Sequence, residues 1–145
     1  MAIVKASFTR SRAGAKASVR YMSHRPGKDG QRLTRELVGY DGTMKLIQAY
    51  EMIDEAGQGS LFYRLVISPD PRTEDAERDL HLREIIEKTM LYLEERFQTA
   101  VPFVAAEHDD HSPNRHTHIL AVLPCRLSVW VRAPHAVAGG SLSTT

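Results

Sequence analysis

The chain has 145 residues, of which 42% are hydrophobic and 26% charged, as in an ordinary soluble protein with one folded domain. It has no run of about 18 apolar residues, which excludes a transmembrane helix, and its single cysteine, Cys125, excludes an internal disulfide. The first residues lack the apolar core of a signal peptide, so we expect a protein of the reducing cytoplasm with no membrane partner.

The formal net charge of +1 is unevenly distributed along the chain. Residues 1–36 carry nine Lys and Arg side chains against two acidic ones, whereas the remainder carries ten basic and sixteen acidic groups. A basic block of this kind favours a polyanionic partner, and nucleic acid is the commonest one. A solvated basic face without a partner is the alternative.

The N-terminal segment predicts a strand followed by a helix. Residues 2–8 alternate in part and predict the strand. Thr9 or Ser11 can cap the helix, because a hydroxyl accepts hydrogen bonds from the free N–H groups of a first turn. Tyr21 lies near the C-terminal end of this helix, and a spacing of four residues puts it on one face with Ala13 and Ala17.

The next segment predicts a polar excursion and a second helix. A turn over residues 26–30 opens a polar and basic stretch, residues 31–42, which we expect to be mobile or to face DNA. Residues 43–56 predict a helix that ends at Gly57. The positions expected to be buried in this helix are Met44, Ile47, Met52 and Ile53.

The remaining elements predict an α+β fold, with a mostly antiparallel sheet and helices packed on one face. Residues 61–67 and 101–108 predict strands, and residues 73–97 predict the longest helix. The apolar stripe of that helix is Leu82, Ile86, Met90, Leu93 and Phe97. Residues 125–133 predict one more short strand, and we expect residues 134–145 to be disordered.

Four of the seven histidines lie between residues 108 and 118. Turn-forming residues between His108 and His116 predict a β-hairpin, and His116 and His118 face the same side of its second strand. Three imidazoles that converge from paired strands can bind a divalent metal and leave positions open for water or substrate. The alternative is a surface His-x-His pair without a metal.

Tyr21 can complement such a metal site. A tyrosine hydroxyl can attack a phosphodiester and become joined to the released end, while a divalent metal stabilises the charge that develops on the phosphoryl oxygens. The bond energy is kept in the phosphotyrosine, so that the strand can later be rejoined. This chemistry requires a basic surface for the DNA backbone, which residues 1–36 offer.

Three segments resemble the motifs of the relaxases, the mobilisation nucleases of the HUH endonuclease superfamily. Residues 13–22 resemble the first motif, with Tyr21 as nucleophile. Residues 62–69 resemble the second motif, whose strand ends in Ser68 and helps to hold DNA. Residues 107–118 resemble the third motif, His-x-Asp followed by His-x-His, which binds the metal. The order of the three motifs also agrees, and the resemblance covers residues 1–124.

The resemblance implies an HUH-like fold and a DNA nickase that cuts one strand at a transfer origin of a plasmid or mobile element. It implies a covalent 5′-phosphotyrosine intermediate and Mg²⁺ or Mn²⁺ bound by His108, His116 and His118, although imidazole also suits Zn²⁺, Ni²⁺ and Co²⁺. Asp110 would orient a ligand histidine or act as a base. Single-stranded DNA and other relaxosome proteins are the implied partners. The DNA-binding side chains predicted by this interpretation are Arg12, Lys16, Arg20, Arg25, Lys28, Arg32, Ser68 and Arg115.

Several alternatives stay open at this point. Relaxase domains usually continue past the third motif, so residues 125–145 suggest a truncated domain, and a catalytically impaired DNA-binding remnant or accessory mobilisation protein is the second hypothesis. A metal hydrolase unrelated to DNA is the third. Tyr40 is a second candidate nucleophile, although it lies in a Gly-Tyr-Asp-Gly turn. Arg115 replaces the proline of the usual Asn-Pro-His-x-His pattern and either contacts phosphate or fills a loop.

Overall fold

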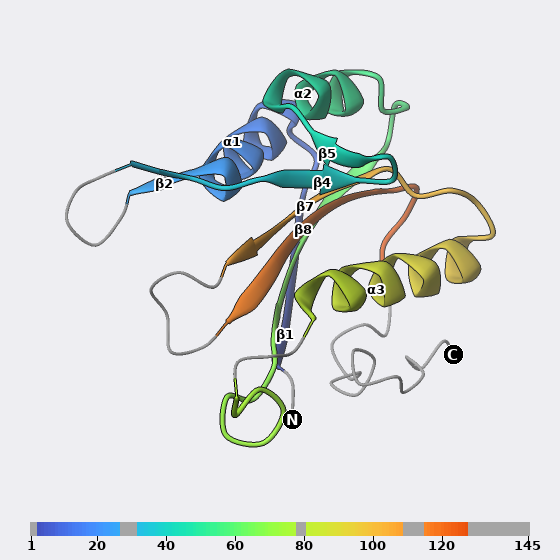
Figure 1. Ribbon diagram of the computed structural model, residues 1–145. Coiled ribbons are helices and arrows are strands. Elements are labelled where there is room, and N and C mark those ends of the chain that lie inside the picture. Colours follow the sequence, from blue (N-terminus) through green and yellow to red (C-terminus); the bar gives the residue numbers. More distant parts are fainter. Residues whose placement is uncertain (1–2, 27–31, 78–80, 109–114, 128–145) are drawn as a thin grey trace.

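The structure, a computed structural model, describes residues 3–26, 32–77, 81–108 and 115–127, and in these residues a six-stranded sheet is covered by three helices (Figure 1). The strand order is β1-β6-β8-β7-β4-β5, and every neighbouring pair is antiparallel. The strands are β1 (Ile3–Thr9), β4 (Leu37–Gly39), β5 (Gly42–Met44), β6 (Leu61–Ser68), β7 (Phe103–His108) and β8 (His116–Leu123). The helices are α1 (Arg12–Ser23), α2 (Leu46–Asp54) and α3 (Leu82–Phe97). A separate two-stranded ribbon pairs β2 (His24–Pro26) with β3 (Arg32–Thr34).

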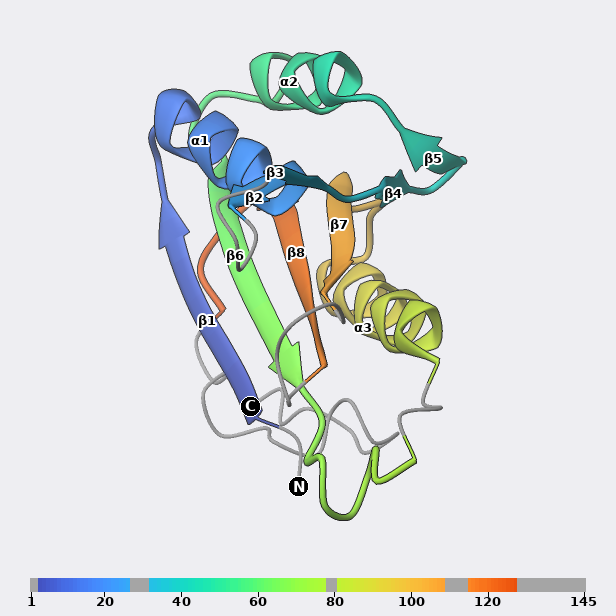
Figure 2. The same ribbon diagram turned by 60° about the vertical axis from the view of Figure 1, so that its left-hand side comes forward.

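The sheet separates two hydrophobic cores. On one side α3 packs through Ile86, Met90 and Leu93 against residues of β6 and β8. On the other side α1 and α2 pack through Val19 and Ile53. The α+β class and the mostly antiparallel sheet are therefore confirmed, whereas the expectation of helices on one face is wrong (Figure 2).

The reason for two covered faces lies in the central strand β6. Leu61, Phe62 and Tyr63 are consecutive and all buried, so the strand presents large apolar side chains in both directions. A strand with a continuous apolar run needs cover on both faces, whereas a strict alternation of apolar and polar residues would need only one. The side chains of β8 alternate between the two cores, with Ile119 in the core under α3 and Leu120 in the core under α1 and α2.

Helix α1 carries the tyrosine of interest. The Ser11 hydroxyl accepts a hydrogen bond from the Gly14 N–H at 3.0 Å, which confirms one of the two predicted caps. The face buried against the sheet consists of Ala15, Val19 and Met22. Tyr21 is turned about 100° from its neighbour Met22 on the helical wheel. It therefore lies beside the buried face and is 49% exposed in the last turn.

The polar segment 31–42 is not an irregular excursion, because it contributes β3, β4 and the turn into β5, whereas the alternative that it faces DNA stays a prediction. Leu37 and Val38 are each 3% exposed, and Val38 pairs with Ala105 of β7. Two apolar residues inside a polar stretch are too short a run to predict a strand. Their burial depends on the long-range pairing with β7.

Both later helices begin after their predicted starts. Helix α2 begins at Leu46, and the expectation that Ile47 is buried is wrong, since it is 59% exposed. Residues 71–77 form turns in place of the first part of the long helix. The Asp70 carboxylate accepts a hydrogen bond from the Arg72 N–H at 2.8 Å, and such a local contact favours a turn over a helix. The predicted apolar stripe of α3 is otherwise confirmed from Leu82 to Leu93.

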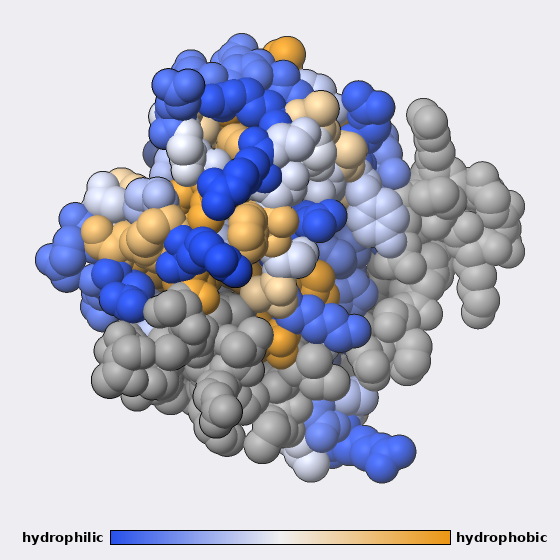
Figure 3. Space-filling model, turned by 180° about the vertical axis from the view of Figure 1, so that it is seen from behind, coloured by the Kyte–Doolittle hydropathy of each residue, from blue (hydrophilic) through white to orange (hydrophobic). Residues whose placement is uncertain are grey.

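The remaining features of the fold are the surface over α2 and the last described residues. Seen from behind, the top of the molecule, where α2 lies, is mostly hydrophilic (Figure 3). Within the described ranges no helix has the length and apolar character needed to cross a bilayer. Residues 125–127 form no strand, and the rest of the predicted strand, together with residues 134–145, lies outside the described residues.

Candidate functional site

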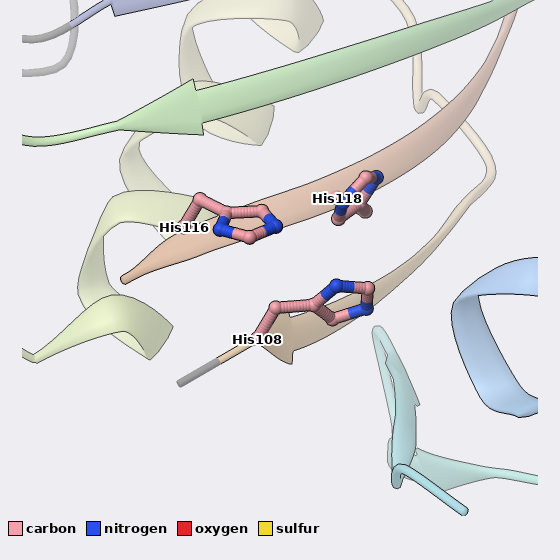
Figure 4. Close-up of side chains that lie close together, drawn as sticks. All are labelled: His108, His116 and His118. Carbon is pink, nitrogen blue, oxygen red and sulfur yellow. The ribbon is translucent and has the colours of Figure 1, made fainter. Parts of the chain in front are cut away.

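Three histidine rings converge at one end of the β7–β8 hairpin (Figure 4). In the register of the two strands, His108 faces His116 and Ala106 faces His118. The ring centroids lie 5.0 Å apart for His108 and His116, 4.2 Å for His108 and His118, and 4.9 Å for His116 and His118. The predicted convergence of these histidines from paired strands is therefore present.

The three rings can hold a metal ion. One nitrogen of each ring can be chosen so that the three nitrogens lie within 4.8 Å of one another. His108 is 1% exposed, and neither of its ring nitrogens has a hydrogen-bond partner among the described residues. A buried polar atom without a partner costs free energy, so an orphaned imidazole beside two others fits a site for a cation. Three protein ligands also leave coordination positions open, as in catalytic metal centres.

The electrostatics of His108 favour its neutral form. Burial, followed by the positive potential of His118, Arg35 and His116, lowers the pKa of His108 from 6.5 to about 3. The backbone of Met22 lies nearby and opposes the shift, although its geometry does not make it a hydrogen-bond partner of the ring. Near neutral pH His108 is therefore unprotonated, which is the form that can donate a lone pair to a metal.

Tyr21 lies beside this cluster. Its ring centroid is 6.3 Å from that of His118, and the two rings meet edge to face. The two residues come from α1 and β8, which are far apart in the sequence and meet because α1 packs across the sheet. The structure thus brings together the tyrosine and the three histidines that the sequence singled out.

Tyr40 lies at the opposite end of β7. Its hydroxyl accepts a hydrogen bond from the Val101 N–H at 3.4 Å, and its ring packs edge to face on Phe103 at 4.9 Å. Phe103 and His108 are the two ends of β7, which at about 3.3 Å per residue puts them roughly 16 Å apart. Burial, followed by the neighbouring Glu94, raises the pKa of Tyr40 to about 12, which disfavours the nucleophilic phenolate.

Three of the predicted DNA-binding residues on α1 are occupied by contacts with α2. Arg12 donates hydrogen bonds to carbonyl oxygens at the C-terminal end of α2, among them that of Ala56 at 2.9 Å. The Lys16 Nζ lies 2.7 Å from a carboxylate oxygen of Asp54, and the Arg20 Nε donates to the Tyr50 hydroxyl at 3.2 Å. These cations hold α1 and α2 together, which gives them a structural role.

Two further candidates lie next to the histidine strand. Ile67 faces Thr117 in the β6–β8 register, so Ser68 follows on the face of the histidines, next to His116. Arg115 precedes His116 and forms an ion pair with Asp75, with an N–O distance of 3.0 Å and side chains that are 11% and 2% exposed. The charge of Arg115 is therefore balanced inside the protein.

For the other predicted site residues, the side chain or the whole residue lies outside the described part of the chain. Arg25 and Arg32 belong by their backbones to the β2–β3 ribbon, and their side chains are outside the described set. Lys28 and Asp110 both lie outside the described residues, so the predicted orienting or basic role of Asp110 stays a prediction.

The sequence did not single out three cations near the site. The charge of Arg35 acts on His108, and Lys5 and Arg64 line a groove beside Tyr21 and His118. Lys5 and Arg64 are each the one charged residue of their strand, and this pattern in the sequence could have indicated them. Their shared location became apparent only with the pairing of β1 and β6.

Comparison with known proteins adds no relative: no protein-family model, no curated protein and no solved structure matches this chain.

Proposed function

We propose that this protein is a metal-dependent DNA strand transferase of the relaxase type within the HUH endonucleases. The observation that carries the proposal is the 6.3 Å approach of the Tyr21 and His118 rings beside the three-histidine cluster. A nucleophile and a Lewis-acid site in contact are the two requirements for phosphodiester displacement with a protein nucleophile. The motif resemblance of residues 13–22, 62–69 and 107–118 supports the same conclusion.

In the proposed reaction, the Tyr21 hydroxyl oxygen attacks the phosphorus of a single-stranded phosphodiester. The bond from phosphorus to O3′ breaks, a Tyr21–O–P bond forms, and the leaving O3′ takes up a proton while the tyrosine loses its own. A divalent cation bound by the histidines, Mg²⁺ or Mn²⁺ by family resemblance, would stabilise the charge on the non-bridging oxygens. A free 3′-hydroxyl can reverse the step and rejoin the strand.

Tyr21 is preferred to Tyr40 as the nucleophile on three grounds. Tyr21 contacts the histidine cluster, whereas Tyr40 lies at the other end of β7. Tyr21 is half exposed in the last turn of a helix, where DNA can reach it. The pKa of Tyr40 is raised to about 12, which makes its oxygen a poor nucleophile near neutral pH.

Incubation with Mn²⁺ and a pool of single-stranded oligonucleotides of randomised sequence tests the proposal, because the protein then selects its own site. We expect a protein–DNA adduct that survives boiling in detergent, appears only with metal and is absent in Tyr21→Phe. Tyr40→Phe is the matched control and should form the adduct as the wild type does. Binding of DNA without any adduct, whatever the metal, would point to a DNA-binding protein without turnover. The absence of both would leave a metal site unrelated to DNA.

A further inference from the structure

A groove of about 700 Å³ opens beside the candidate site, between α1 and the strands β1 and β6. Tyr21 and Ser18 line it from α1, and His118, a member of the histidine cluster, lines it from β8. Figure 2 shows α1 lying over this part of the sheet, and the residues that line the groove come from the helix and from the strands beneath it. A ligand that reaches Tyr21 can continue into this groove.

The register of the sheet sets the order of the groove residues. Lys5 faces Val66 across β1 and β6, and Val66 faces His118 across β6 and β8. Lys5 is therefore two strand spacings from His118, roughly 10 Å. Arg64 lies two residues before Val66 in β6, on the same face and diagonal to Lys5. Both cations line the groove on the side of the sheet that carries the histidines.

Lys5 and Arg64 are available to a ligand. Both are exposed, and neither forms a hydrogen bond or ion pair with another residue of the described ranges. Lys16 of α1 differs, because it is bound by Asp54 at 2.7 Å. Two cations close together with no acidic partner form an electrostatic site for an anion.

The rest of the groove is suited to an aromatic or apolar group. Ala17, Met22 and Val66 line it together with the tyrosine and the two cations. Proteins that bind single-stranded nucleic acid combine a positive surface for the phosphates with apolar or aromatic surface for unpaired bases. Duplex DNA would bury its bases in its own stack and could not use the apolar part.

We propose that this groove binds the single-stranded DNA segment that adjoins the scissile phosphate, with Lys5 and Arg64 as its phosphate contacts. The proposal rests on the function proposed above, because it takes Tyr21 as the point where the strand is cut. It moves the DNA path away from the α1 cations Arg12, Lys16 and Arg20 and onto β1 and β6. The β-strand positions of the two cations fix their spacing, so the groove is preformed.

The test compares two double variants that remove the same charges. Lys5→Ala with Arg64→Ala alters the groove, whereas Lys88→Ala with Arg96→Ala removes one lysine and one arginine from α3, across the sheet. Fluorescence anisotropy in EDTA measures binding of the selected oligonucleotide at several salt concentrations without cleavage. We expect the groove variant to bind roughly tenfold or more weakly and to lose about 1.4 from the slope of log K against log salt. The α3 variant should keep the wild-type slope.

Two further measurements separate this inference from the proposed function. At saturating DNA the groove variant should still form the adduct in Mn²⁺, because Tyr21 and the histidines are intact. The charge-conserving exchange Lys5→Arg with Arg64→Lys should restore binding, which a merely unfolded variant could not do. An unchanged salt slope in the groove variant, equal losses in both double variants, or equally tight binding of the duplex would each overturn the inference. Failure of the wild type to form an adduct would instead overturn the proposed function.

Discussion

His108 and His116 occupy directly opposed positions of β7 and β8, and their rings lie 5.0 Å apart. Opposed positions of an antiparallel pair are held by the sheet itself, so this part of the cluster exists before any ligand binds. A preformed set of imidazoles on two strands would give a metal bound there a rigid site. Metal binding to the folded state can then be measured as an increase in the free energy of unfolding.

Divalent metal is expected to stabilise the folded protein. A ligand that binds only the native state raises the free energy of unfolding by about 2.7 kcal/mol at a hundredfold excess over its Kd. Mn²⁺ should therefore raise the melting temperature in differential scanning fluorimetry, and His116→Ala should abolish most of that increase. His81→Ala is the control, since His81 is exposed at the start of α3 and makes no side-chain cap bond. An increase that persists in His116→Ala but disappears in His81→Ala would contradict this site.

The location of the histidine site could be predicted from the sequence because it depends on local pattern. The spacing of His116 and His118 fixes their common face, and the turn-rich segment before them predicts the hairpin partner. Tyr21 could be proposed from motif resemblance, but its contact with His118 depends on how α1 crosses the sheet. No local pattern specifies that crossing.

Long-range pairing also explains what the sequence did not reveal. The strand β4 depends on the contact of Val38 with Ala105, which are 67 positions apart. The intramolecular contacts of Arg12 and Arg115 could not be foreseen, because a positive charge in the sequence does not name its partner, and their predicted DNA contacts stay predictions. Their partners, the C-terminal end of α2 and Asp75, are each about 40 positions away.

Arg12→Ala is expected to reduce folding stability. Its guanidinium donates to carbonyl oxygens at the end of α2 and lies 5.9 Å above the Phe62 ring. Hydrogen bonds that involve a charged group contribute about 1.5–3 kcal/mol, so we expect a loss in this range in urea unfolding. At a temperature where the variant is folded, the salt slope of DNA binding should equal that of the wild type. A reduced slope with unchanged stability would show that Arg12 contacts phosphate after all.

The ion pair of Asp75 and Arg115 is expected to be worth more than a surface pair. Asp75→Ala leaves Arg115 buried without its carboxylate, which typically costs about 3–5 kcal/mol. Asp54→Ala is the matched control, because it breaks the exposed pair with Lys16, whose contribution should be under about 1 kcal/mol. Urea unfolding of both variants measures the difference. Equal losses would mean that burial of the Asp75 pair has no energetic consequence.

The metal-free protein is expected to lose stability as the pH falls below about 6.5. His108 titrates near its ordinary value of 6.5 when unfolded and at about 3 when folded, so the unfolded state binds more protons between these values. The free energy of unfolding therefore falls on acidification, by up to about 1.4 kcal/mol per pH unit for this group.

Urea unfolding in EDTA between pH 6.5 and pH 4 measures this dependence. His108→Gln removes the titrating ring and should make the dependence shallower by about one proton. His81→Gln removes an exposed histidine from the start of α3 and serves as the comparison variant. A His108→Gln variant as sensitive to acid as the wild type would mean that other groups carry the whole effect.

The most direct measurement is the location of the DNA linkage in the adduct formed with Mn²⁺. Trypsin cleaves after Lys and Arg and puts Tyr21 and Tyr40 in different peptides, residues 21–28 and residues 36–45. The first peptide extends past Arg25 because the bond between Arg25 and Pro26 resists trypsin. After nuclease digestion, mass spectrometry should find a 5′-linked nucleotide on Tyr21 in the first peptide. A nucleotide on Tyr40, or an unmodified Tyr21 in a purified adduct, would contradict the proposed pairing of Tyr21 with the histidine site.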